Sequence, residues 1–462
     1  MVLAMEGGEP VVPPGKIAYW PWVTEDDKEE MLSVIDSGRY WYGVAPPYAE
    51  QISALEEKWA EYTGADYCLT SNSGTAALHM AVAAAGVGPG DEVIVPAYSW
   101  VSSATCVIHH NGIPVFVDVD PNTYNIDPDR IEGAITENTK AIIAVDLYGL
   151  PADYDRILDI SDRYGLKVIE DGCQAHGATY KGRKAGNLGT HSAVASLNGG
   201  KNLPGGEGGL FTTNDEEVYD RASKVLMFGE IFESGKARER KYYALGWMYR
   251  NNEILAAFAK SQLNRLDEMN EKRVKNINYL DEALWDIPIL ETQNAPQDRT
   301  HVHFRYPMKV KPGKCGIDVD VRKFRDAVVA ALRAEGVPLR KTESGSVPLP
   351  GHSVFQGMDA YGSGCPWSCP YYSRREDLSY DVKDYPVTNR IVKNTMSIGH
   401  ADGGIAPPNG LELMDDYIQA FEKVLVDNLE DVADYARGST IEEIQDQTPV
   451  LGMDHFRSPF ED

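Results

Sequence analysis

Basic residues are scarce in this chain of 462 residues. Lysine and arginine total 44 against 70 acidic residues, which gives a formal net charge of −26. A protein that binds nucleic acid through the phosphate backbone needs a basic surface, so this balance argues against nucleic acid as a partner. The acidic excess favours solubility and says little about the fold.

Long apolar runs and patterned cysteines are also missing. No stretch approaches the roughly 20 apolar residues of a membrane span, so we expect no membrane partner. Cys365 and Cys369 lie close together, but no second pair gives them zinc-site spacing, and we expect no metal. Residues 1–15 lack the basic start and apolar core of a signal peptide. These features predict a cytoplasmic protein.

The first half of the chain alternates strand-like runs with helical patterns. The strand-like runs cover residues 67–70, 92–96, 115–119, 141–145, 167–171, 192–197 and 209–213. This alternation predicts an α/β domain built on a mostly parallel seven-stranded sheet, with functional groups at the carboxyl ends of the strands. Longer helical patterns follow over residues 251–285, 321–335 and 411–434.

Three local features together indicate one chemistry. Lys201 lies in a glycine-rich stretch, Asp171 ends a buried-strand pattern, and residues 71–77 form a small-residue turn that opens a helix. Taken singly, the lysine could be a surface residue and the aspartate a helix N-cap. A lysine amine, a strand-end acid and a helix N-terminus are what pyridoxal phosphate needs for a Schiff base, a ring-nitrogen partner and a phosphate site.

At these residues the chain resembles the DegT/DnrJ/EryC1/StrS family of aminotransferases. The resemblance rests on the order and spacing of five motifs, Ser73-Gly-Thr-Ala-Ala-Leu-His, Val93-Ile-Val-Pro, Tyr148-Gly-Leu-Pro-Ala-Asp, Val168-Ile-Glu-Asp-Gly-Cys-Gln-Ala-His-Gly-Ala and Lys201-x5-Glu-Gly-Gly. It implies fold-type I of the pyridoxal-phosphate enzymes and a homodimer with active sites at the subunit interface. The implied parts are an N-terminal extension (1–24), a large cofactor domain (25–290), a small C-terminal α/β domain (291–437) and an acidic tail (438–462).

The resemblance also implies roles for single residues. Lys201 would carry the cofactor and move protons, and Asp171 would bind the pyridine nitrogen. Gln174 would contact the ring's 3-oxygen. Trp100, which could equally be a core residue, would stack on the ring. The phosphate would be bound by Gly74, Thr75, Ala76 and Ser196.

One departure from the family pattern concerns the stretch Gly246–Glu253. Many relatives carry an asparagine at position 248 that reaches the partner subunit's phosphate, but here Met248 cannot donate a hydrogen bond. Arg250 or Asn251 is therefore expected to take over this contact, and Arg250 is the residue we assign to the cofactor site. The segment 361–376, rich in Cys, Pro and Tyr, matches no standard sugar-nucleotide subgroup, which weakens the case for a nucleotide-linked substrate.

The activity implied is transfer of an amino group from glutamate or glutamine to a ketone on a sugar or cyclitol. Two alternatives stay open at this point. One is a dehydratase or lyase on the same fold, similar to aminohydroxybenzoate synthases, which keep the lysine. The other is a non-catalytic cofactor-bound scaffold, against which the intact pair of Lys201 and Asp171 argues.

Overall fold

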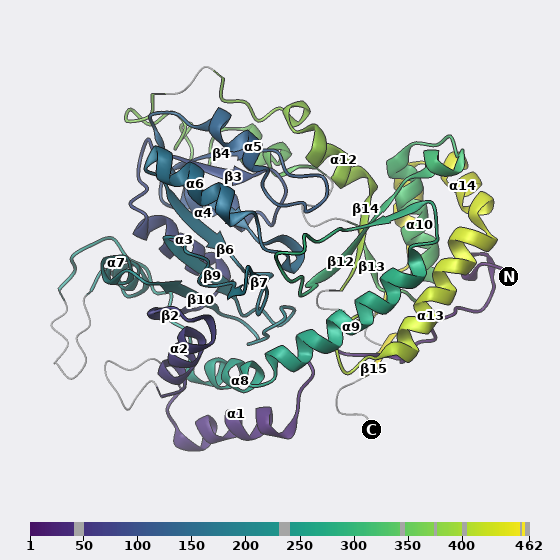
Figure 1. Ribbon diagram of the computed structural model, residues 1–462, viewed down its shortest axis with the longest axis horizontal. Helices are drawn as coiled ribbons and strands as arrows, with labels where there is room; N and C mark the ends of the chain where they lie inside the picture. The colour runs from purple at the N-terminus through teal and green to yellow at the C-terminus, as the bar shows by residue number, and fades with distance from the viewer. Residues whose placement is uncertain are drawn as a thin grey trace.

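The computed structural model describes residues 1–40, 50–230, 241–341, 347–373, 377–399, 404–452 and 455–457. Its largest feature is a seven-stranded sheet in which only β10 runs against its neighbours (Figure 1). The strand order is β2 (Tyr67–Ser71), β10 (Gly209–Thr213), β9 (Ser192–Ser196), β6 (Lys167–Asp171), β5 (Thr139–Val145), β3 (Glu92–Pro96) and β4 (Ile113–Val117). The predicted fold class is confirmed.

Helices cover this sheet and explain the near-continuous apolar character of its strands. Every residue of β3, β4, β9 and β10 is buried, as expected of a sheet covered on both faces. The surrounding helices are α1 (Glu25–Ser37), α2 (Glu50–Thr63), α3 (Gly74–Ala84), α4 (Ser102–His109), α5 (Pro128–Ile131), α6 (Tyr154–Tyr164), α7 (Glu216–Leu226) and α8 (Glu253–Leu263). Among the described helices, none has the length and apolar character needed to cross a membrane.

A second, antiparallel sheet forms the core of a smaller lobe. Its strands are β11 (Leu290–Thr292), β12 (Arg305–Val310), β14 (Thr395–Gly399) and β13 (Leu339–Arg340). The helices of this lobe are α9 (Leu266–Leu284), α10 (Val321–Ala334), α13 (Leu411–Glu422), α14 (Leu429–Gly438) and α15 (Ile441–Gln447), and α9 leads into it from the large sheet (Figure 1).

Both ends of the chain pack onto this second core. Leu3 and Val12 are buried in it, and Ile444 of α15 joins it from the C-terminal side. Strand β1 (Ile17–Ala18) pairs in parallel with β15 (Phe456–Arg457). The described parts of the N-terminal extension and of the acidic tail are thus folded against the small lobe. The exact domain boundaries stay a prediction.

The Cys/Pro/Tyr-rich segment packs against the edge of the large sheet, although it lies between strands of the small one. The Tyr372 hydroxyl donates to Glu92 Oε1 (2.9 Å), and the Tyr380 hydroxyl donates to the Pro114 carbonyl (2.7 Å). The Trp367 indole donates to the Tyr380 hydroxyl (2.8 Å). Residues 374–376 lie outside the described part of the chain.

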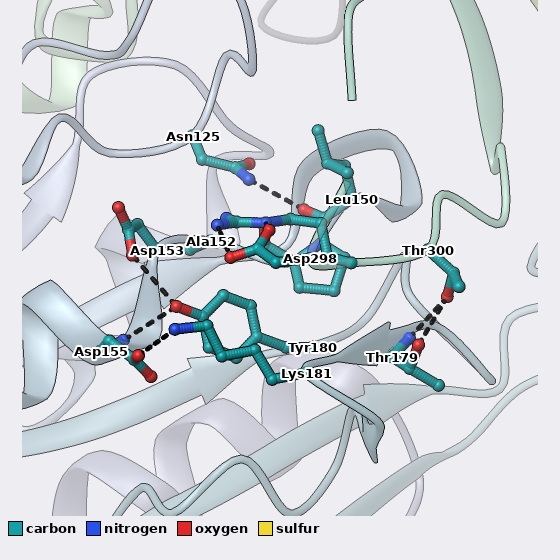
Figure 2. A network of polar contacts seen from close by, with 12 residues as sticks. Asn125, Leu150, Ala152, Asp153, Asp155, Thr179, Tyr180, Lys181, Asp298 and Thr300 are labelled. Carbon is teal, nitrogen blue, oxygen red and sulfur yellow. Dashed lines mark hydrogen bonds and ion pairs between the residues drawn. The ribbon is translucent and has the colours of Figure 1, made fainter. Parts of the chain in front are cut away.

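A polar network fixes the segment that leads into β12 (Figure 2). Thr179 and Thr300 exchange backbone contacts, with Thr300 N donating to Thr179 O (2.9 Å). Lys181 N donates to Asp298 O (2.7 Å), and the Tyr180 hydroxyl donates to Asp153 Oδ1 (3.1 Å). The start of the small lobe is therefore held against loops of the large sheet.

Candidate active site

A cavity of about 350 Å³ opens where β2, β6 and β9 end. Polar side chains make up most of its wall, which consists of Ser73, Gly74, Thr75, Leu78, Ser99, Trp100, Ser102, Ser103, Asp171, Cys173, Gln174, Ser196, Asn198, Lys201, Glu207 and Arg305. A larger cavity of about 620 Å³ lies along α9, and another of about 580 Å³ lies between the N-terminal residues and the C-terminal end of α10. Neither Lys201 nor Asp171 lines either of them. The structure thus gathers at one site the residues that the sequence placed far apart.

Asp171 is the buried acid of this cavity, with 4% of its surface exposed. The Ser103 hydroxyl donates to Asp171 Oδ2 (2.7 Å), and Cys173 N donates to Oδ1 (3.3 Å). Ser99 in turn contacts Ser103 (Oγ to Oγ, 2.9 Å). Burial, followed by the Asp171 charge, raises the pKa of the Cys173 thiol well above its usual value, so that the thiol stays neutral. Sequence reasoning missed Ser103, because only the tertiary placement of α4 beside the end of β6 brings its hydroxyl to Asp171.

Lys201 lies in the turn after β9, where its N–H donates to the Asn198 carbonyl (2.8 Å). Its ammonium nitrogen is 4.3 Å from the ring centroid of Phe304, a residue of the small lobe that the sequence did not single out. Burial, and secondarily the Lys201 charge, lower the pKa of His176 to about 3. The imidazole beside the lysine is therefore neutral at physiological pH.

The start of α3 forms one wall of the cavity. Ser73 is its N-cap, and its Oγ accepts a hydrogen bond from Ala76 N (3.1 Å), so Ala76 is engaged in capping and does not line the cavity. Thr75 Oγ1 lies 2.8 Å from Ser102 Oγ. A Cβ on Gly74 would come within 2.9 Å of Ser196 Cβ, so glycine is required for this close approach.

Gln174, Ser196 and Trp100 complete the predicted set around the cavity. Gln174 Oε1 accepts from Tyr148 N (2.8 Å), which occupies the acceptor end of the amide and leaves its NH₂ end for a ligand. Ser196 Oγ accepts from Asn198 N (3.3 Å). Trp100 lies at the wall with 56% of its surface exposed.

Arg250 is the one other predicted residue that does not line the cavity in this single chain. Its guanidinium carbon lies 5.7 Å from the Phe228 ring centroid, and Met248 is 51% exposed. The resemblance also implies that residues near 228–252 lie close to the partner's cofactor, and residues 231–240 of that stretch lie outside the described residues. Conversely, Arg305 lines the cavity and is 6% exposed. No motif in the sequence around Arg305 indicated that it would lie at a site.

The donor set fits pyridoxal phosphate. A buried carboxylate suits a protonated ring nitrogen, and a lysine amine on the same cavity suits the aldehyde carbon. The phosphate needs N–H groups without acceptors inside the helix, which the first turn of α3 supplies beside the Thr75 and Ser196 hydroxyls. The fold and the site together define an α/β enzyme of the aminotransferase class.

Comparison with known proteins identifies the family. The model of the DegT/DnrJ/EryC1/StrS aminotransferase family matches residues 22–402, and the chain belongs to this family, as the sequence predicted. Aminotransferases of this family depend on pyridoxal phosphate. An L-glutamine:scyllo-inosose aminotransferase of Streptomyces griseus is 33% identical over 441 residues, covering 93% of this chain and 99% of that protein. An L-glutamine:2-deoxy-scyllo-inosose aminotransferase of Streptomyces lividus is 36% identical over 68% of this chain and 75% of that protein.

Solved structures agree with this assignment. A 3-amino-5-hydroxybenzoic acid synthase superposes with a TM-score of 0.76 at 25% identity, covering 92% of this chain and all of that one. DesV of S. venezuelae, solved with a ketimine intermediate, superposes with a TM-score of 0.72 at 26% identity, covering 88% of this chain and 98% of that one.

Proposed function

We propose that this aminotransferase moves an amino group from glutamine or glutamate to a ketone on a cyclitol or sugar, with pyridoxal phosphate as its cofactor. The observation that carries the proposal is the placement of Lys201 and Asp171 on one cavity with the α3 N-terminus. The near full-length similarity to a glutamine-dependent inosose aminotransferase supports a free cyclitol ketone as acceptor and glutamine as donor.

Each part of the cavity would hold one part of the cofactor. Lys201 would bind it covalently, Asp171 would hold a proton at the ring nitrogen, and Gln174 would donate to the 3-oxygen. Trp100 would cover one face of the ring, for which stacking contributes of order 1 kcal/mol beyond burial. The phosphate would lie against Gly74, Thr75 and Ser196. When bound, the cofactor supplies an electron sink for the carbon that loses its proton.

The chain's own residues would carry the proton movements. Lys201, once released from the cofactor, is placed to take a proton from the donor carbon and return it at the next position as general base and acid. Ser103 Oγ and Cys173 N donate to the two carboxylate oxygens of Asp171 and so hold its orientation. Cys173 and His176 stay neutral, so neither of them adds a charge beside the lysine.

The direct test is an incubation of the protein with pyridoxal phosphate, L-glutamine and scyllo-inosose, followed by mass spectrometry. We expect an aminocyclitol to accumulate as glutamine is consumed. 2-Deoxy-scyllo-inosose and a nucleotide-linked keto-sugar are tested as competing acceptors. The acceptor that is aminated fastest shows which class of ketone the enzyme uses. Absence of amine from every acceptor, with the cofactor bound, would contradict the proposal.

A dehydratase of the aminohydroxybenzoate type is the second candidate. The superposition with such a synthase over the whole of its chain favours it. It predicts loss of water from an amino-keto substrate and an aromatic product that absorbs in the ultraviolet, with no consumption of glutamine. The same incubation, repeated with an amino-keto substrate in place of the cyclitol ketone and followed by ultraviolet absorbance, separates the two activities.

The homodimer remains a prediction, and Arg250 tests it. We expect Arg250→Ala to raise the dissociation constant for pyridoxal phosphate roughly 10- to 100-fold, because a charge-assisted phosphate contact contributes about 1.5–3 kcal/mol. Titration of the apoprotein by fluorescence measures this, with Arg130→Ala, a half-exposed arginine on α5, as control. An unchanged affinity for pyridoxal phosphate would refute the contact between Arg250 and the phosphate. A fully active monomer in sedimentation would refute an active site formed by two subunits.

Arg305 is the cation best placed to receive the carboxylate of an amino-acid donor. It is buried in the same cavity as Lys201, and a guanidinium binds carboxylates in a planar, bidentate way. We expect Arg305→Leu to raise KM for glutamine about tenfold or more with little change in KM for the ketone, and Arg305→Lys to restore part of the loss. Steady-state kinetics with each substrate varied separately measures this. An equal rise for both substrates would contradict the assignment.

A further inference from the structure

The turn Tyr148–Gly149 has a backbone that its residue types do not favour. Tyr148 adopts a left-handed conformation (φ 58°, ψ 7°), which is rare for a bulky residue and is held only where the surroundings enforce it. Gly149 has φ 97°, and a Cβ there would lie 2.9 Å from Val302 Cγ2 and 3.0 Å from the Gln174 carbonyl oxygen. This turn belongs to a motif that the proposed function leaves without a role.

Backbone groups of the turn contact both lobes. The N–H of Tyr148 donates to Gln174 Oε1 (2.8 Å), which fixes the orientation of that amide at the cavity wall. On the other side, Phe304 N donates to the Tyr148 carbonyl (2.8 Å) and Val302 N donates to the Gly149 carbonyl (3.0 Å). Phe304 is the residue whose ring lies 4.3 Å from the Lys201 ammonium. One turn therefore positions both Gln174, which would contact the cofactor ring, and Phe304, which lies beside Lys201.

Aromatic packing holds the turn in its unfavourable conformation. The Tyr148 side chain is fully buried, and its hydroxyl lies 2.6 Å from the Tyr98 hydroxyl. Its ring packs edge-to-face on Tyr98 and Tyr124, with centroids 6.3 and 6.0 Å away. Residues 302–304, which contact this turn, are also held from the side of Lys201. The amide of the neighbouring residue, Asn202, donates to the Val302 carbonyl (3.0 Å).

We propose that Tyr148–Gly149 is a positioning element of the active site. It presents the NH₂ end of Gln174 to the 3-oxygen of the cofactor and keeps Phe304 against Lys201, and in this it rests on the proposed function. A donor at the 3-oxygen stabilises negative charge there. By orienting this donor, the turn would lower the pH at which the lysine-bound cofactor loses its proton.

Gly149→Ala tests this inference, with Gly182→Ala as the matched control. Gly182 also has positive φ (81°), but a Cβ there would meet nothing within 4 Å. The control therefore introduces the same kind of backbone strain without pushing neighbouring residues away. The readout is the pH midpoint of the visible absorption of the protein loaded with pyridoxal phosphate. We expect Gly149→Ala to raise this midpoint by about one pH unit, since the hydrogen bond lost is to a charged group. The control should keep the wild-type midpoint.

A double variant establishes the route of the effect. Gln174→Ala alone should raise the midpoint similarly, and adding Gly149→Ala should then change it little, because both act on one hydrogen bond. If Gly149→Ala fails to fold, Tyr98→Phe, which removes the hydroxyl contact to Tyr148, should shift the midpoint in the same direction by less. A midpoint equal to that of the control, or fully additive shifts, would overturn the proposal. A wild-type protein without any lysine-bound cofactor would instead overturn the proposed function.

Discussion

Lys201→Ala is expected to abolish covalent attachment of pyridoxal phosphate and to reduce transamination by at least about 10³-fold. The cofactor has one electrophilic carbon and needs one positioned amine, and the same lysine is the general base for the proton transfer. The fold should persist, because the Lys201 backbone contact to Asn198 does not depend on the side chain. Borohydride reduction followed by peptide mass spectrometry locates the modified residue.

Lys140→Ala is the control for this experiment, since Lys140 is the exposed residue of β5 and does not line the cavity. That variant should retain both the modification and the activity. If borohydride still fixes the cofactor to the protein in Lys201→Ala, at another lysine, Lys201 has been assigned wrongly.

Asp171→Asn is expected to slow the reaction by about 10²- to 10³-fold while the cofactor stays attached to Lys201. The substitution keeps the shape of the side chain but removes the charge that would hold a proton at the ring nitrogen, and loss of one preorganised electrostatic contact costs this much. Single-turnover kinetics with glutamine alone isolates the first half of the reaction. Rates near those of the wild type would contradict the role of Asp171.

Ser103→Ala provides the companion measurement. Ser103 donates to Asp171 Oδ2 but does not carry its charge, so we expect a smaller loss, because the carboxylate remains and loses only one of the hydrogen bonds that orient it. A loss as large as that of Asp171→Asn would mean that the hydroxyl itself takes part in the chemistry.

The sequence by itself determined the fold class and the family, and it predicted most of the residues that the structure places on one cavity. Alternation of short β-rich runs with helices specifies a parallel sheet, and the ends of its strands specify where polar side chains gather. Asp171, Lys201 and Gly74 were found because each follows a strand in a local motif. The information lay within a few neighbouring residues, and the structure placed all three on one cavity.

Tertiary packing decided the features whose partners are distant in sequence. The helical pattern over 251–285 is divided into α8 and α9, and near the break Gln262 and Arg265 donate to Asp27 and to the Trp22 carbonyl. The pattern over 411–434 is interrupted at residues 423–427, where the buried Lys423 donates to Glu335 (2.8 Å). A buried charge must be paired, and periodicity carries no information about such pairs.

The same reason explains which site residues sequence reasoning missed. Ser103, Phe304 and Arg305 reach the cavity from α4 and from the small lobe, and none lies in a motif with Lys201. The left-handed conformation of Tyr148 was equally hidden, because the buried rings of Tyr98 and Tyr124 hold it in place. The local sequence determined which chemical groups are present. The long-range packing of the two lobes decided how these groups are oriented, because the direction of a side chain follows from contacts that no local pattern encodes.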